Sequence, residues 1–238
     1  QAIQMATINA AKHFRLEDGS YIAAQYDVPV HYLDSNGEWQ DIDNTLSASG
    51  NEYSTSNARI KFAKKITGNE SIFTIHDGNR KITLSLDRAI KKTQGKIQNS
   101  SSDNNSESKL QKMMTLDKLS SKIIYENILA DTDLQYIVNS GSIKENIIVK
   151  KSQSAYSYTF TLKLNNLDAR LNDDGSISVF ASGENEDVYY IPAPVVYDAN
   201  GDYAPSSVSR YSLVASGNNT YSLTVTVDAE WMNENERA

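Results

Sequence analysis

Hydrophobic and polar residues alternate in short runs along most of this chain, and tight-turn dipeptides separate the runs. Residues 156–164 alternate over nine positions without a break, and residues 221–227 repeat the pattern. Alternation with a period of two is typical of a strand with one face on a core and one in water. Asp-Gly and Asn-Gly pairs tolerate positive φ and close tight hairpins. They occur at Asp18-Gly19, Asn36-Gly37, Asp77-Gly78, Asp174-Gly175 and Asn200-Gly201. The pattern predicts an all-β fold, an antiparallel β-sandwich with minor helical turns.

The same pattern divides the chain into four regions. Residues 1–12 read as an N-terminal extension, and residues 13–90 as the first half of the sandwich. The region 91–120 begins with a Ser/Asn-rich stretch that buries too little surface to offset its ordering entropy, so a loop or linker with a short helical turn is expected. Residues 121–238 form the second half, with Asp228 placed to cap a final helical turn. The halves form either one super-sandwich or two packed sandwiches.

Composition and charge narrow the functions that such a fold could serve. The 238 residues include no cysteine, which excludes disulfides and thiolate chemistry, and no apolar run approaches the roughly 18 residues of a spanning helix. We therefore expect no membrane insertion. The net charge is -7, and no aromatic-basic recognition motif is present, which argues against nucleic acid as a partner. Residues 59–96 carry ten Lys/Arg against three acids. Three explanations of this basic stretch stay open. It could face an anionic partner, it could attract the acidic C-terminal part of the chain, or its charges could simply be solvated.

No arrangement of residues in the sequence predicts catalysis. The histidines, His13, His31 and His76, are scattered, and no G-x-S-x-G elbow accompanies them. The best paired carboxylates for glycoside hydrolysis are Asp131, Asp133 and Glu145, because a hairpin over 133–146 could bring Asp133 near Glu145. Turn capping and cross-strand ion pairs are the simpler explanation of these acids, and the sequence does not show that they share a cleft. We therefore assign no catalytic residue and expect a protein that is not an enzyme.

Two binding hypotheses remain open. Asp198, Asn200 and Asp202 place oxygen ligands at alternate positions around a glycine, as does the turn 34–38, which resembles part of a calcium loop. Asx-rich hairpin turns have the same appearance, so calcium is only one interpretation and no other cofactor is expected. Exposed aromatic side chains are the usual platform for sugars. The aromatic residues not assigned to the core are Trp39, Tyr189, Tyr190, Tyr197 and Tyr203.

Four segments, in this order, resemble a module of secreted wall-associated RHS/YD-repeat proteins and of the related DNRLRE-domain bacterial surface proteins. They run over residues 13–46, 125–147, 191–201 and 223–238, with stretches such as Gly37-Glu38-Trp39-Gln40-Asp41 and Lys144-Glu145-Asn146-Ile147. The resemblance covers nearly everything from residue 13 onward, and residues 97–108 look like an insertion relative to it.

The resemblance implies an extracellular or cell wall-associated β-sandwich module of a multidomain surface or toxin-delivery protein. Its partners would be the neighbouring domains of the same polypeptide and cell-wall or other glycans, and it implies no catalytic residues. The first functional hypothesis is therefore a non-enzymatic structural or interaction module. A carbohydrate-binding module and a carbohydrate-active enzyme of the epimerase, lyase or hydrolase type are the alternatives.

Overall fold

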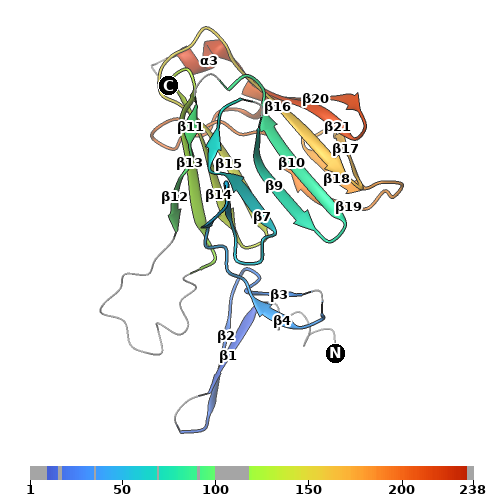
Figure 1. Ribbon diagram of the computed structural model, residues 1–238. Coiled ribbons are helices and arrows are strands. Elements are labelled where there is room, and N and C mark those ends of the chain that lie inside the picture. The colour runs from blue at the N-terminus through green and yellow to red at the C-terminus, as the bar shows by residue number, and fades with distance from the viewer. Residues whose placement is uncertain are drawn as a thin grey trace.

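The computed structural model describes residues 10–15, 18–34, 36–68, 70–89, 92–99 and 118–234. All of its paired strands are antiparallel, which confirms the predicted all-β class (Figure 1). The largest sheet has eight strands. In spatial order they are β20 (Ser209–Gly217), β21 (Thr220–Val227), β16 (Tyr156–Asn165), β10 (Arg80–Leu86), β9 (Ser71–Asp77), β7 (Ile60–Ala63), β6 (Glu52–Ser54) and β5 (Ser47–Ser49).

Two smaller sheets cover the inner face of this eight-stranded sheet. One has the order β12 (Lys96–Asn99), β13 (Ser121–Leu129), β14 (Thr132–Asn139) and β15 (Ser142–Val149). The other has the order β17 (Leu167–Leu171), β18 (Ile177–Ala181) and β19 (Asp187–Ile191). The remaining strands form pairs: β1 (Ala11–Arg15) with β2 (Tyr21–Gln25), β3 (His31–Leu33) with β4 (Trp39–Asp41), and β8 (Lys65–Ile66) with β11 (Thr93–Gln94). A 3-10 helix, η1 (Ser206–Val208), and the helix α3 (Ala229–Asn233) complete the described elements.

Aromatic side chains join the two layers of the sandwich. The buried ring of Tyr136 on β14 lies 5.6 Å from the ring of Phe62 and 5.4 Å from that of Phe73, both on the eight-stranded sheet. At the other end of that sheet, the hydroxyl of Tyr221 accepts a hydrogen bond from the backbone N–H of Ala169 on β17. One continuous cluster of buried apolar side chains therefore lies between the eight-stranded sheet and both smaller sheets.

The two predicted halves of the chain share the largest sheet. Leu84 on β10 pairs with Leu162 on β16, which joins the strands before residue 91 to those after residue 120. The alternation over 156–164 has the predicted outcome, because Tyr156 and Tyr158 are buried with Phe160. The hairpins closed by the predicted Asp-Gly and Asn-Gly turns are also present between β1 and β2, β3 and β4, β9 and β10, and β17 and β18.

The expectation of a loop after residue 91 is wrong for residues 93–99, which contain β11 and β12. Ile97 pairs with Ile123 of β13, and the side chain of Asn99 bonds the backbone of Leu46 at 3.0 and 3.1 Å. Such short strands depend on partners remote in sequence, so local polarity misrepresents them. The rest of the predicted linker, with its helical turn near Leu110, lies outside the described residues. The C-terminal cap is confirmed, because the Asp228 carboxylate accepts from the Glu230 N–H at 2.8 Å.

The strand pairs β1–β2 and β3–β4 project from the sandwich, below the body in Figure 1. Val30, between them, is fully buried, and the Ser140 hydroxyl donates a hydrogen bond to the Pro29 carbonyl. These contacts attach the projecting region, named here the N-terminal hairpins (residues 10–41), to the end of β14. Among the described residues, no helix is both long and apolar enough to cross a membrane.

Candidate functional site

The aromatic residues predicted to bind sugar do not form one platform. Trp39 lies on β4 in the N-terminal hairpins, and Tyr190 lies on the edge strand β19 with 57% of its surface exposed. Tyr189 is half-buried, and its hydroxyl donates to Asp77 at 2.6 Å. The structure brings together only Tyr197 and Tyr203, whose backbones form an isolated bridge.

The Tyr197–Tyr203 pair is exposed and lies beside β15. The ring centroids are 5.8 Å apart at an angle of 51°, so the rings are tilted and share no plane. The Tyr197 hydroxyl donates to Asn146 Oδ1 at 3.3 Å, and Lys144 Nζ lies 5.5 Å from the Tyr197 ring centroid. Two aromatic faces, an amide and a cation therefore meet at this place. Such a set can contact a hydroxylated or anionic ligand.

The predicted calcium turns use their carboxylates internally. Asp198 Oδ1 accepts from the backbone N–H groups of Asn200 at 2.8 Å and Asp202 at 3.1 Å, and the latter bond is the main reason that the pKa of Asp198 is lowered. Asp34 accepts in the same way from Asn36 and Glu38. In the part of the chain that the structure describes, no three His, Cys, Asp or Glu side chains gather as metal ligands would. Both loops have the geometry of Asx turns, and calcium binding stays a prediction.

The carboxylate pair considered for glycoside hydrolysis is separated by the sheet. Asp133 pairs with Ile148, whereas Glu145 pairs with Tyr136. Positions 133 and 136 are three residues apart on one strand, so their side chains point to opposite faces, and paired residues share a face. The hypothesis that the hairpin brings Asp133 near Glu145 is therefore wrong, because the register puts the sheet between them.

The histidines also occupy separate places. His31 Nε2 lies 2.9 Å from Asp41 Oδ1 in the β3–β4 pair. His76 is on β9, where burial, followed by the charges of Lys81 and Lys61, lowers its pKa. The side chain of His13 lies outside the described residues.

Glu145 faces the interior of the sandwich. It lies on β15 between Ile143 and Ile147, which pack against the core, and opposite the buried Tyr136. Burial raises the pKa of Glu145 to about 7, although the nearby Tyr136 hydroxyl partly opposes the shift. The charge of Glu145 also contributes, after burial, to raising the pKa of Tyr211 on β20 to about 12. Glu145 thus lies where the edges of both sheets approach each other, and inward-pointing charges on edge strands oppose edge-to-edge pairing.

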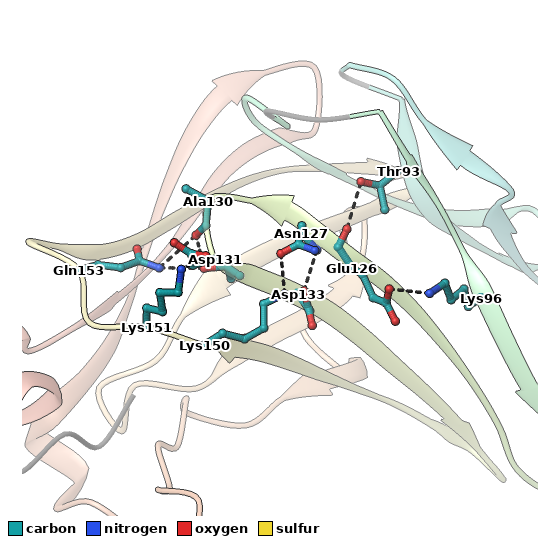
Figure 2. A network of polar contacts seen from close by, with 11 residues as sticks. Thr93, Lys96, Glu126, Asn127, Ala130, Asp131, Asp133, Lys150, Lys151 and Gln153 are labelled. Atoms are coloured by element: carbon teal, nitrogen blue, oxygen red, sulfur yellow. Dashed lines mark hydrogen bonds and ion pairs between the residues drawn. The ribbon is translucent and has the colours of Figure 1, made fainter.

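A network of polar contacts occupies the end of the four-stranded sheet (Figure 2). It begins at an irregularity in β13, where the register with β14 shifts between Tyr125 and Leu129 and Asn127 adopts φ 52°. The carboxylate of Asp133, which is 10% exposed, accepts from the Asn127 backbone N–H at 2.6 Å and meets Lys150 Nζ at 2.7 Å. Lys150 Nζ also donates to the Asn127 side-chain Oδ1 at 2.5 Å. Three side chains from three chain segments therefore converge on one point.

Further contacts hold the chain around this point in place. Lys151 Nζ lies 3.2 Å from Asp131 Oδ1, and the Gln153 side chain donates to the Ala130 carbonyl and the Thr132 hydroxyl. On the other side, Lys96 Nζ lies 2.5 Å from Glu126 Oε2, as Figure 2 shows. The β13–β14 turn is thereby joined to β12 and to the chain after β15.

A hollow of about 550 Å³ lies beside this end of the sandwich. It is lined by the ends of β10, β13 and β16, with Leu86, Asp87, Arg88, Leu129, Ser157, Tyr158 and Thr159. None of the residues that the sequence suggested as site residues lines it. The polar point formed by Asn127, Asp133 and Lys150 was likewise missed, apart from Asp133, because the left-handed backbone at Asn127 has no signal in the sequence.

Comparison with known proteins finds relatives among large bacterial proteins. The chain is 27% identical over 228 residues to the tRNA3(Ser)-specific nuclease WapA of Bacillus spizizenii and, over the same length, to the tRNA(Glu)-specific nuclease WapA of Bacillus subtilis subsp. natto. Each match covers 92% of this chain, which spans only 9% of the length of the relative. A wall-associated protein of Geobacillus stearothermophilus is 36% identical over 93 residues, which are 39% of this chain and 35% of that protein.

No protein-family model matches the chain, and no solved structure matches it either. The chain is therefore a distant homologue of one region of WapA. Its homologues include a wall-associated protein, which points to a location at the cell surface.

Proposed function

We propose that this chain is a non-enzymatic structural and interaction module of a large secreted bacterial surface or toxin-delivery protein, located outside the cell or on its wall. One observation carries the proposal: the chain matches two relatives at the same identity and over the same length, although their names give them different tRNA targets. A region shared in this way does not choose the target. A role in building or presenting the rest of the polypeptide accounts for it.

The arrangement of polar residues supports the same role. The carboxylates weighed for hydrolysis lie on opposite faces of a sheet, and the Asp198 and Asp34 carboxylates bond the amides of their own turns. The acidic balance of the chain disfavours tRNA as its ligand. Its partners would instead be the neighbouring domains of the same polypeptide. The exposed Leu33 and Trp39 of the N-terminal hairpins offer apolar surface to such a domain.

The proposal is tested by replacing the matching region of the Bacillus subtilis subsp. natto WapA with this chain. We expect the hybrid to keep the tRNA specificity of the recipient and its surface location, whereas a deletion without replacement loses the surface location. The chain alone should leave total tRNA intact. Cleavage of tRNA by the chain, or a changed target in the hybrid, would overturn the proposal.

A second function, carbohydrate binding, is favoured by the Tyr197–Tyr203 pair with Lys144 and Asn146 beside it. Calorimetric titration with soluble cell-wall glycan fragments tests it. Tyr203→Ala should abolish binding, because Tyr203 is the more exposed ring, at 73%. Tyr21→Ala is the matched control, since Tyr21 is equally exposed but lies on the N-terminal hairpins. If glycan fragments bind Tyr203→Ala and Tyr21→Ala with the same heat, this site is excluded.

A further inference from the structure

We propose that Lys150 and Asn127 form an intramolecular amide bond, between Nζ of the lysine and Cγ of the asparagine, with Asp133 as the acid–base group. The inference is independent of the proposed function, because it concerns a covalent modification of the chain itself. It rests on the three side chains that converge at the end of the four-stranded sheet (Figure 2).

The first support is the approach of the two reacting groups. Lys150 Nζ lies 2.5 Å from Asn127 Oδ1. The C=O bond adds about 1.2 Å, so Nζ is at most about 3.7 Å from Cγ. Bound reactants separated by roughly 3 to 3.5 Å are close to the geometry of attack, and fixing them there removes much of the entropic barrier. The other two lysines in Figure 2, Lys96 and Lys151, face carboxylates instead.

The second support is the placement of Asp133. Its side chain is 10% exposed and contacts both reacting residues, Lys150 through Nζ at 2.7 Å and Asn127 through the backbone N–H at 2.6 Å. A lysine ammonium has no free electron pair, so attack requires that a neighbouring base first remove a proton. Asp133 is within hydrogen-bonding reach for that transfer. It is a positioning and acid–base group, whereas the carboxamide of Asn127 is the electrophile, because a carboxylate repels nucleophiles.

The reaction balances without a further reactant. The Lys150 ammonium gives a proton to Asp133, and the resulting amine attacks Cγ of Asn127, forming a C–N bond and a tetrahedral intermediate. Asp133 then returns its proton toward Nδ2, the bond from Cγ to Nδ2 breaks, and ammonia leaves. Because the attacking nitrogen also loses a proton, the ammonia departs as ammonium and Asp133 ends as a carboxylate. One ammonium ion replaces the lysine's positive charge, and no oxidant or reductant is needed.

The chain contains no cysteine and therefore no disulfide, and the proposed bond would provide a covalent cross-link of similar effect. Asn127 lies in the irregular part of β13, and Lys150 follows the end of β15, so the link would enclose all of β14 and β15. A cross-link that closes such a loop limits the unfolded ensemble, as a disulfide does. By that comparison, the linked chain should melt about 10 °C above the same chain without the link.

The intact mass of the purified, folded 238-residue chain decides the proposal. We expect a mass lower than the sequence mass by one ammonia, either at once or after incubation at neutral and mildly alkaline pH. Tryptic digestion followed by tandem mass spectrometry should show Lys150 uncleaved and joined to the peptide that contains Asn127. A chain that keeps its full sequence mass after prolonged incubation overturns the proposal, as would a loss mapped to any other pair.

Substitutions distinguish the effect of the covalent Lys150–Asn127 bond from that of the hydrogen bonds among the same residues. Lys150→Arg keeps the positive charge but provides no nucleophilic amine, and Asp133→Asn keeps an acceptor for the Asn127 amide but removes the base. Both should retain the full mass, and Lys150→Arg should show the lower melting temperature. Lys151→Arg, one residue away, is the matched control and should lose ammonia as the parent does. A mass loss that persists in Lys150→Arg and maps to Asn127 would contradict the assignment.

Discussion

The sandwich body contains a core of buried aromatic rings, whereas none of the aromatic side chains described in the N-terminal hairpins is buried. In the body, Tyr125, Tyr136 and Phe62 are completely buried, and the ring of Tyr136 packs against each of the other two. In the N-terminal hairpins, Trp39 remains 42% exposed and Tyr21 69% exposed. Both regions consist of antiparallel strands joined by tight turns, but among the residues that the structure describes only the body has a second layer to cover its inner face. The buried rings therefore stabilise the body, whereas the exposed rings of the N-terminal hairpins contribute little to folding stability.

The largest effect should come from removing the ring at the centre of the body. Tyr136→Ala leaves a cavity among Phe62, Phe73 and Tyr125, and loss of a large buried aromatic typically costs about 3 to 5 kcal/mol. Urea unfolding followed by circular dichroism measures the change in the free energy of unfolding. Tyr136→Phe keeps the ring and serves as the control. A cost below about 1 kcal/mol for Tyr136→Ala would show that the two layers are not joined there.

A smaller, pH-dependent effect is expected at Glu145, on the edge of the body. Because its pKa is raised to about 7 from an ordinary 4.5, the folded chain binds this proton more tightly than the unfolded chain. The contribution of Glu145 to stability is then fully present below about pH 4.5 and is lost as the pH rises to about 7. Above that pH, Glu145→Gln should be more stable than the parent by about 3 kcal/mol.

The measurement for Glu145 is a series of urea unfolding curves from acidic to mildly alkaline pH. The difference between parent and Glu145→Gln should vanish at the acidic end. Glu184→Gln, at an exposed position, is the matched control and should follow the parent throughout. A constant difference across the series would mean that the amide acts through packing, with no part played by the titration.

The helix cap at the C-terminal end should contribute less than the core. Asp228 is the cap of α3, with its carboxylate bonded to the N–H groups of Glu230 and Trp231. Asp228→Ala should reduce the free energy of unfolding by about 1 kcal/mol, and Asp228→Asn should restore most of it, because an amide oxygen also accepts. Thermal melts of the three chains give this order. If the alanine and asparagine variants are equally stable, the loss of stability does not come from the helix cap.

The smallest effect is expected in the N-terminal hairpins. Trp39→Ala should change the free energy of unfolding by no more than about 0.5 kcal/mol, because the ring is exposed and contributes little to a core. The same denaturation assay applies. A loss comparable to that of Tyr136→Ala would end the contrast between the two regions, and it would show that the hairpins fold as part of the body.

Expectations that depend on local pattern agree with the structure, and those that depend on remote contacts do not. Alternation over 156–164 placed Tyr156 and Phe160 in the core, and Asp228 caps the final turn as predicted. The local composition predicts a loop where strand β12 lies, because the stability of β12 comes from pairing with β13, beyond residue 120. The meeting of Lys150 with Asn127, 23 residues apart, was not predictable either. The contact depends on the left-handed backbone conformation of Asn127 within a strand, and the pattern of side chains does not predict that conformation.

By itself, the amino-acid sequence determined the antiparallel β class, the hairpin turns and the cysteine-free, acidic character of the chain. These follow from period-two patterning and turn chemistry, which act over a few residues. Only the tertiary structure decided which side chains meet: that Asp133 and Glu145 face opposite sides, that Tyr197 and Tyr203 form a pair, and that Lys150 reaches Asn127. The reason is that strand register and layer packing are set by contacts between segments far apart in the sequence, and shifting a register by one residue reverses every face.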